Sequence, residues 1–261
     1  MIEIDPADWA AIVQSNQFYA GFLARASHEL RSPLSSLMSL HQLILNDLCD
    51  SHEEERDCIN QAYQAANRLL KMLELVTYIS KVEVGLSPLQ IDTICLHTLF
   101  EDVRSLTQIQ AANRNITLLM EIPGEDPLNP PLKSDYRMLR QSLFCLVESS
   151  LYALSSGVVK LWCPDPIRQN SLVINIATTP PLAAWQDLNN FSLENPEKSW
   201  EILQASDQNF AETVPGDRSC FSLEYSLIIS QILLQRINGK LLLMESDQAD
   251  HPFYLQCRLE N

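Results

Sequence analysis

Ser27-His28-Glu29-Leu30-Arg31-Ser32-Pro33-Leu34 lies inside a long periodic stretch and decides how the N-terminal part of this chain folds. Apolar residues recur around it in steps of three and four, at Leu23, Ala26, Leu30, Pro33, Leu37, Leu40 and Ile44. This period predicts one long helix, from Phe18 to about Asn46, with an apolar seam. With Leu23 at heptad position a, His28 falls at position f, away from the seam, so its imidazole is expected to be exposed. Pro33 removes one backbone hydrogen bond within the helix and should bend it.

A second helix is predicted directly after the first. The acidic stretch Asp50–Glu55 suits a turn followed by the first turn of a helix, where negative charge is favourable. The predicted seam of this helix is formed by Ile59, Ala62, Ala66, Leu69, Leu73 and Val76. The helix should end near Val84–Gly85, where glycine suits a C-cap. One hairpin cannot bury a full seam alone, so two copies are expected to form a dimeric four-helix bundle.

The remainder of the chain alternates between helical and strand patterns. Helices are predicted at 96–113, 135–154 and 223–237, and strands at 116–122, 158–162, 171–176, 240–245 and 253–259. A proline-rich loop is expected at 124–131, and a short helix at 200–205 within an irregular stretch. Helices mixed with antiparallel strands predict a two-layer α/β sandwich. The predicted organisation is an extension at 1–15, the hairpin at 16–86 and the α/β domain at 87–261.

The charge, the hydropathy and the cysteine content limit which partners, cellular location and metal sites are expected. The chain has 33 acidic and 18 basic residues, a net charge of −15, which disfavours binding to nucleic acid or anionic membranes. We see no signal peptide and no apolar segment long enough to span a bilayer, so we expect a cytoplasmic protein. The seven cysteines are scattered and form no C-x-x-C pair, which predicts free thiols and no zinc site.

Three segments together resemble one known family. His28–Leu34 fits the phospho-acceptor motif His-Glu/Asp-x-x-Thr/Asn-Pro-Leu, with Ser32 in place of Thr or Asn. Val76–Gly85 resembles the end of that family's dimerising hairpin, and Asp135–Leu143 resembles the entry to its asparagine box. From about residue 15 onward, the chain therefore resembles the transmitter module of a two-component sensor histidine kinase.

The resemblance implies roles for three residues. His28 would be the phospho-acceptor, which must be exposed and neutral at its attacking nitrogen. Glu29 would take the proton from the other ring nitrogen. Ser32 occupies the position that orients water for dephosphorylation of a response regulator, which makes phosphatase activity possible. The implied partner is the receiver domain of a response regulator.

The nucleotide-binding half departs from the family pattern. Ser149 stands where the asparagine box has its metal-binding Asn, and Thr178 lies in Ala177–Pro181, which lacks the first glycine box's Asp and glycines. Ser222, Glu224 and Ser226 stand where the second box has its three glycines. Their side chains obstruct close backbone approach, and a carboxylate near a triphosphate costs on the order of 1–4 kcal/mol per charge pair. We therefore expect ATP binding to be impaired or lost, with no bound metal or cofactor.

Three functions remain open. The first is a dimeric phosphotransferase that exchanges phosphoryl groups between His28 and a response regulator aspartate. The second is an active histidine kinase, autophosphorylating with ATP and Mg²⁺ or phosphorylated in trans by a competent histidine kinase partner. The third is a non-catalytic scaffold that binds a receiver domain. The intact motif at Ser27–Leu34 favours the first two, and the missing glycines favour the first over the second.

Overall fold

The described part of the chain forms two compact units. The structure, a computed structural model, describes residues 6–121, 132–164, 171–182, 185, 222–246 and 252–260; within these ranges it leaves out the side chains of 6–21, 24, 25, 83, 224 and 260. One unit contains the chain up to Val84 together with Ser222, and the other contains the described residues from Gly85 to 185 and from Leu223 onward. The loop predicted at 124–131 and the short helix at 200–205 lie outside the described residues.

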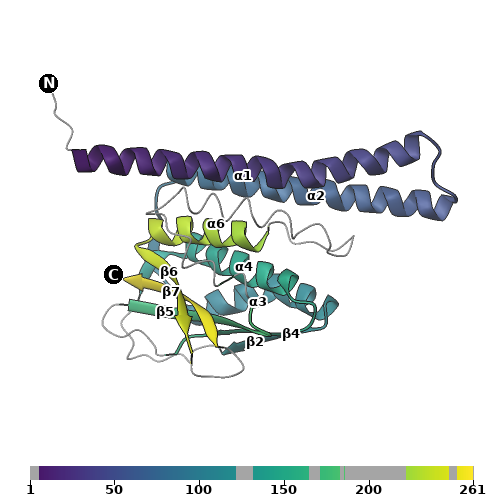
Figure 1. The fold of residues 1–261 in the computed structure, drawn as a ribbon. Coiled ribbons are helices and arrows are strands. Elements are labelled where there is room, and N and C mark those ends of the chain that lie inside the picture. Colours follow the sequence, from purple (N-terminus) through teal and green to yellow (C-terminus); the bar gives the residue numbers. More distant parts are fainter. Residues whose placement is uncertain are drawn as a thin grey trace. The chain divides into compact units, whose positions relative to one another are not determined.

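The first unit contains a helical hairpin, as the sequence predicted. Helices α1 (Pro6–Leu45) and α2 (His52–Glu83) run side by side (Figure 1). Helix α1 begins at Pro6 and not at Phe18, so much of the segment predicted as an extension is helical. Proline suits the first helical position because its φ is already helical and its missing N–H would have no intrahelical partner there. Further along, α1 continues through Pro33 without a break.

Local capping fixes both ends of α2. The Ser51 hydroxyl accepts a hydrogen bond from the backbone N–H of Glu54 at 3.2 Å, which satisfies one free donor of the first turn. The Glu54 carboxylate in turn accepts from the N–H of Asp50 at 2.7 Å. At the other end, Gly85 adopts a φ of +73° directly after the C-cap Val84. The helix ends predicted from the sequence are therefore confirmed.

The buried seam of the hairpin differs in part from the predicted one. Ala26, Pro33 and Ala62 are buried as expected, whereas Leu23, Ile59 and Leu73 are 51%, 50% and 45% exposed. The buried positions on α2 are Cys58, Ala62, Ala65, Met72, Ile79 and Val82. Helix α2 carries two adjacent apolar stripes, and the predicted seam mixed residues of both. The helical period alone does not say which stripe packs against α1.

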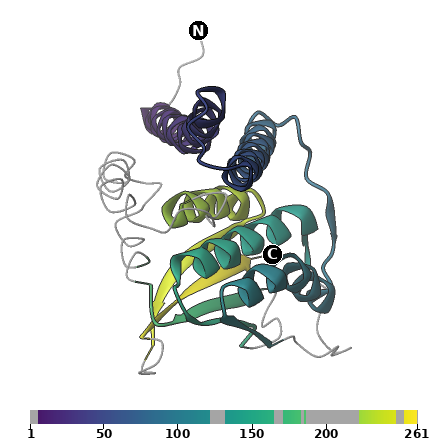
Figure 2. The same cartoon turned by 90° about the vertical axis from the view of Figure 1, so that its right-hand side faces the viewer.

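The second unit is a two-layer α/β domain, which confirms the predicted fold class. Its elements are β1 (Ile91–Thr93), α3 (Leu96–Asn113), β2 (Ile116–Glu121), β3 (Lys133–Asp135), α4 (Tyr136–Ala153), β4 (Gly157–Trp162), β5 (Ser171–Thr179), α6 (Leu223–Arg236), β6 (Gly239–Glu245) and β7 (Phe253–Glu260). The five-stranded sheet has the order β2-β4-β5-β7-β6, and β1 pairs with β3 in a separate antiparallel ladder. Figure 2 shows helices α3, α4 and α6 on the same face of the sheet.

Strand pairing corrects the prediction in two places. Strands β2 and β4 are parallel, with Ile116 opposite Gly157, although antiparallel strands were expected. Helix α4 lies between them in sequence and provides the crossover that parallel strands require. Strand β5 continues to Thr179, beyond the predicted end at 176, because Val158 and Val159 of β4 extend its ladder.

The core of the domain lies between the sheet and its helices. On β5, Leu172 is fully buried, and every residue from Ile174 to Thr178 is buried as well. On α4, Leu139, Leu143 and Leu146 are fully buried. Within the described ranges, no helix has both the length and the apolar character needed to cross a membrane.

Candidate functional site

His28 lies on the outside of α1. Its side chain is exposed, while Ala26, two residues before it, and Pro33, five residues after it, are buried in the hairpin. These two buried residues fix the rotation of the helix, and so direct the intervening imidazole outward. The Ser27 hydroxyl donates to the backbone carbonyl of Leu23 at 2.8 Å. Packing of the seam therefore presents His28 to solvent.

Glu29, the predicted proton acceptor, is half-buried and engaged in hydrogen bonds. Both of its carboxylate oxygens accept from Ser222, which belongs to the same compact unit. The Ser222 hydroxyl donates to Oε1 at 2.9 Å, and its backbone N–H donates to Oε2 at 3.3 Å. The hydrogen bonds therefore join a residue of the phospho-acceptor motif, Glu29, to a residue aligned with the second glycine box, Ser222.

Ser32 is exposed on the same side of α1 as His28. The two residues are four positions apart, a spacing that places side chains above one another on a helix. Arg31 is exposed beside them. The helix therefore offers an imidazole, a hydroxyl and a guanidinium along one accessible surface.

The residues aligned with the asparagine box are buried in the α/β domain. Ser149 is 2% exposed, and its hydroxyl donates to the backbone carbonyl of Leu146 at 3.2 Å. Glu148 is 5% exposed and accepts a hydrogen bond from Gln110 of α3 at 3.3 Å. Among the described residues, no three His, Cys, Asp or Glu side chains gather where they would hold a metal ion.

The positions aligned with the glycine boxes carry side chains in ordered elements. Thr178 is buried within β5, paired with Val159 of β4, so Ala177–Thr179 of the segment predicted to follow the strand belong to it. Ser222 precedes α6, Ser226 lies in its first turns, and both are buried. Tyr225 is fully buried beside them, and the side chain of Glu224 lies outside the described residues. Helix α6 therefore begins without the glycines that let a backbone approach phosphates closely.

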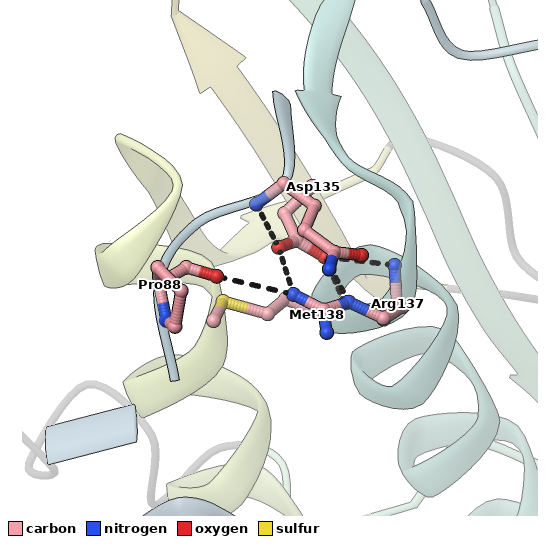
Figure 3. Close-up of polar contacts among 5 residues, drawn as sticks. Pro88, Asp135, Arg137 and Met138 are labelled. Carbon is pink, nitrogen blue, oxygen red and sulfur yellow. Dashed lines mark hydrogen bonds and ion pairs between the residues drawn. The ribbon is translucent and has the colours of Figure 1, made fainter. Parts of the chain in front are cut away.

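Asp135 organises the start of α4 and the segment that follows the hairpin. Its carboxylate accepts from the backbone N–H groups of Arg137 and Met138, which caps the helix. It also accepts from the N–H of Gln90 at 2.8 Å and from the guanidinium of Arg137 at 2.8 Å. Figure 3 shows the Arg137 side chain also reaching the carbonyl of Pro88, at 3.3 Å. Hydrogen bonds therefore connect residues 88–90 to the N-terminus of α4.

The surroundings of Asp135 change its acidity. Burial by itself raises the pKa of the carboxyl group, but the hydrogen bonds from Arg137, Gln90 and Met138 outweigh it, and the net pKa is lowered. Hydrogen bonds and a nearby cation both favour the ionised carboxylate. The hydrogen-bond donors therefore stabilise Asp135 as a buried, ionised carboxylate.

The sequence prediction made Asp135 the first residue of a helix and gave it no role of its own. The residue is in fact the N-cap of α4 and the last residue of β3. An Asp immediately before an apolar helical run is a recognised N-cap signal and would have identified the cap. The bond from Gln90 to Asp135 and the bond from Arg137 to Pro88 join positions 45 and 49 residues apart, and no local pattern indicates them.

Comparison with known proteins gives consistent matches. Residues 20–85 match the His Kinase A (phospho-acceptor) domain. The chain is 30% identical over 147 residues to the sensory/regulatory protein RpfC of Xanthomonas campestris, a match covering 56% of this chain and 20% of RpfC. It is 26% identical over 153 residues to histidine kinase 1 of Arabidopsis thaliana, covering 58% of this chain and 12% of that protein. The chain thus spans a fifth or less of these two relatives.

Solved structures share the fold at low sequence identity. The histidine kinase AdeS of Acinetobacter baumannii has a TM-score of 0.60 and 14% identity, covering 89% of this chain and 97% of AdeS. Histidine kinase ThkA, solved in complex with the response regulator protein TrrA, has a TM-score of 0.53 and 17% identity, covering 91% of this chain and 60% of that chain. The match of residues 20–85 to a phospho-acceptor domain and the fold shared with histidine kinases support a transmitter module of the two-component histidine kinase type.

Proposed function

We propose that His28 exchanges phosphoryl groups with the aspartate of a response regulator. In the forward step an imidazole nitrogen attacks the phosphorus of the aspartyl phosphate, the N–P bond forms, and the carboxylate leaves with the electrons of the O–P bond. The reverse step returns the phosphoryl group to the aspartate. The observation that carries this proposal is the exposed His28 on a helix whose sequence matches the phospho-acceptor domain.

Glu29 supports this chemistry as the proton acceptor. A neutral imidazole carries one N–H, and the ring becomes cationic when its other nitrogen attacks. A carboxylate on the next residue stabilises that cation and takes its proton. The bonds from Ser222 to both carboxylate oxygens keep Glu29 in place, and each oxygen retains a further lone pair.

Side chains at the former glycine positions support an external source of the phosphoryl group. Ser222 and Ser226 are buried at the start of α6, where the family binds phosphates against backbone N–H groups. The asparagine position is filled by Ser149, whose hydroxyl is bonded to its own helix. We therefore propose that ATP binds weakly or not at all, and that a response regulator or a competent histidine kinase supplies the phosphoryl group.

Partners and assembly belong to the same proposal. A receiver domain is the expected partner, and the ThkA–TrrA complex is an example of such a pairing in a protein of similar fold. A homodimer closing into a four-helix bundle is supported by the second apolar stripe of α2, where Ile59, Tyr63, Leu70 and Leu73 are 45–68% exposed. We keep the cytoplasm as the expected location.

Transfer of labelled phosphate tests the proposal. The wild-type chain is incubated with γ-labelled ATP and Mg²⁺, and separately with receiver domains carrying a labelled aspartyl phosphate. His28→Ala is the test variant. His41→Ala is the matched control, because His41 is another exposed histidine on α1.

We expect acid-labile label on the wild type and on His41→Ala after incubation with a receiver, and none on His28→Ala. Incubation with ATP alone should leave all three proteins unlabelled. Labelling by ATP that depends on His28 would instead identify an active kinase. Receiver binding that survives in His28→Ala, without transfer to the wild type, would identify a scaffold.

A further inference from the structure

Two cysteines meet at the turn of the hairpin. Cys49 lies between the two helices, three residues before the start of α2, and Cys58 lies in the second turn of α2. Their sulfur atoms are 4.0 Å apart, within reach of an S–H···S hydrogen bond. Cys58 is buried, and Cys49 is half-buried. At this distance, one thiol can attack the other sulfur once an oxidant has converted that sulfur to a sulfenic acid or a mixed disulfide.

From this geometry we infer that Cys49 and Cys58 form an oxidant-sensitive dithiol, which closes to a disulfide and clamps the hairpin turn. A disulfide bond is about 2.05 Å long, so the sulfurs must approach by about 2 Å. Cys49 lies outside both helices, so a small change in the connecting segment can supply this movement. Cys58 is held within the helix and sets the position of the bond.

The chemistry requires an oxidant such as hydrogen peroxide. The Cys49 thiolate, the more accessible of the two, attacks the peroxide, which yields a sulfenic acid and hydroxide. The Cys58 thiol then displaces the sulfenic oxygen as water and completes the S–S bond. Two thiols and one peroxide thus give one disulfide and two waters. Glutathione disulfide achieves the same oxidation by thiol exchange, with release of two glutathione thiols.

The surroundings make this pair slow to react when the pH is low. Burial raises the pKa of Cys49, and the hydrogen bond to Cys58 and the nearby Glu54 and Glu55 act in the same direction. Since the thiolate is the nucleophile, oxidation of the pair should accelerate as the pH rises. Glu54 and Glu55, which favour the start of α2, therefore also disfavour the thiolate form of Cys49.

The disulfide would act on the cap of α2. Ser51 and Glu54, which make the capping hydrogen bonds, lie between the two cysteines in sequence. Joining Cys49 to Cys58 closes a short loop around this cap and restricts the unfolded chain. Oxidation should therefore raise the thermal stability of the hairpin.

Trypsin provides a direct test because Arg56 separates the two cysteines. Cleavage after Arg31, Arg56 and Arg68 places Cys49 in peptide 32–56 and Cys58 in peptide 57–68, each with a single cysteine. The full chain is reduced, treated with hydrogen peroxide or glutathione disulfide at two pH values, alkylated and digested. Mass spectrometry then shows whether the peptides are joined. Cys49→Ser and Cys58→Ser are the test variants, and Cys95→Ser, which removes an exposed thiol, is the matched control.

We expect peptides 32–56 and 57–68 to be linked in the oxidised wild type and in Cys95→Ser, and to separate on reduction. The oxidised protein should run as a monomer in a non-reducing gel and melt at a higher temperature than the reduced protein. Neither cysteine variant should show the link or the thermal shift. Two unlinked, alkylated peptides after oxidation would overturn the inference, and so would a dimer band that is lost in Cys49→Ser.

Discussion

The fully buried carboxylate of Asp135 lies 2.8 Å from the guanidinium of Arg137, whose side chain is 40% exposed. One member of the ion pair is thus inside the domain, and the other connects it to the surface. The same carboxylate caps α4 and bonds to Gln90, and Arg137 bonds to Pro88. The pair therefore joins the segment after the hairpin to the start of the helix that should carry the asparagine box.

Removal of the Asp135 carboxylate should destabilise the α/β domain. We expect Asp135→Ala to lower the free energy of unfolding by about 2–3 kcal/mol, because a cap and charge-assisted bonds are lost together. Asp135→Asn should cost about 1 kcal/mol, since asparagine is also a good N-cap. Urea unfolding measures both changes. Asp92→Asn, at an exposed position of β1, is the control and should have little effect. Equal values for the Asp135 and Asp92 variants would show that the network adds no stability.

The lowered pKa of Asp135 predicts how its contribution depends on pH. The pKa is below the ordinary value of 3.8 in the folded state, so the charged form is favoured by folding. Its stabilising effect is complete above the unfolded pKa and is lost as the pH falls through the folded pKa. The difference in unfolding free energy between wild type and Asp135→Asn should therefore be constant above about pH 5 and shrink below about pH 4. A difference that grows on acidification would contradict the assigned direction.

Arg114 should stabilise the end of α4. It follows α3, and its guanidinium donates to the backbone carbonyls of Leu151, Tyr152 and Leu154 at 3.1–3.3 Å. It also lies 4.9 Å from the ring centre of Tyr152. We expect Arg114→Ala to lower the unfolding free energy by about 1–3 kcal/mol and Arg114→Lys to restore less than half of it, because lysine lacks the planar fork. Arg56→Ala, at an exposed position of α2, is the control in the same unfolding assay.

The outer stripe of α2 predicts a way to separate the proposed dimer. Leu70 is 55% exposed in the single chain, so Leu70→Glu should change the monomer's helix content little while placing a charge in the bundle. Light scattering should give twice the mass of one chain for wild type and a single-chain mass for the variant. Lys71→Glu, at the neighbouring exposed position, should stay dimeric. A wild-type protein with the mass of one chain would show that the outer stripe of α2 does not form a dimer interface.

The Ser32 hydroxyl predicts a phosphatase effect separate from transfer. Ser32→Ala should slow hydrolysis of the receiver's aspartyl phosphate at least several-fold, while transfer to His28 is kept. Ser32→Thr keeps the hydroxyl, adds the methyl group of the family's threonine and should hydrolyse at least as fast as wild type. The measurement follows release of inorganic phosphate from a labelled receiver. Equal rates in all three proteins would show that Ser32 does not orient the water.

Features set by neighbouring residues were predicted well from the sequence. The cap at Ser51 and the glycine at Gly85 gave the ends of α2, and the limits predicted for α3 are those of the structure. The start of α1 was missed because the residues between Pro6 and Phe18 lack a clear period, although they are compatible with a helix. The exposed position of His28 followed from the heptad, whereas the exposure of Leu23 did not.

The sequence by itself determined the hairpin, most strands of the domain and the run from Ser27 to Leu34, together with the serines where glycines are expected. Only the tertiary structure decided which stripe of α2 is buried, that β2 and β4 are parallel, that Asp135 holds Gln90, and that Cys49 meets Cys58. Periodicity and capping act over a few residues and can be read locally. The choice of partner depends on long-range packing and long-range hydrogen bonds, which emerge only when distant segments compete for the same surfaces.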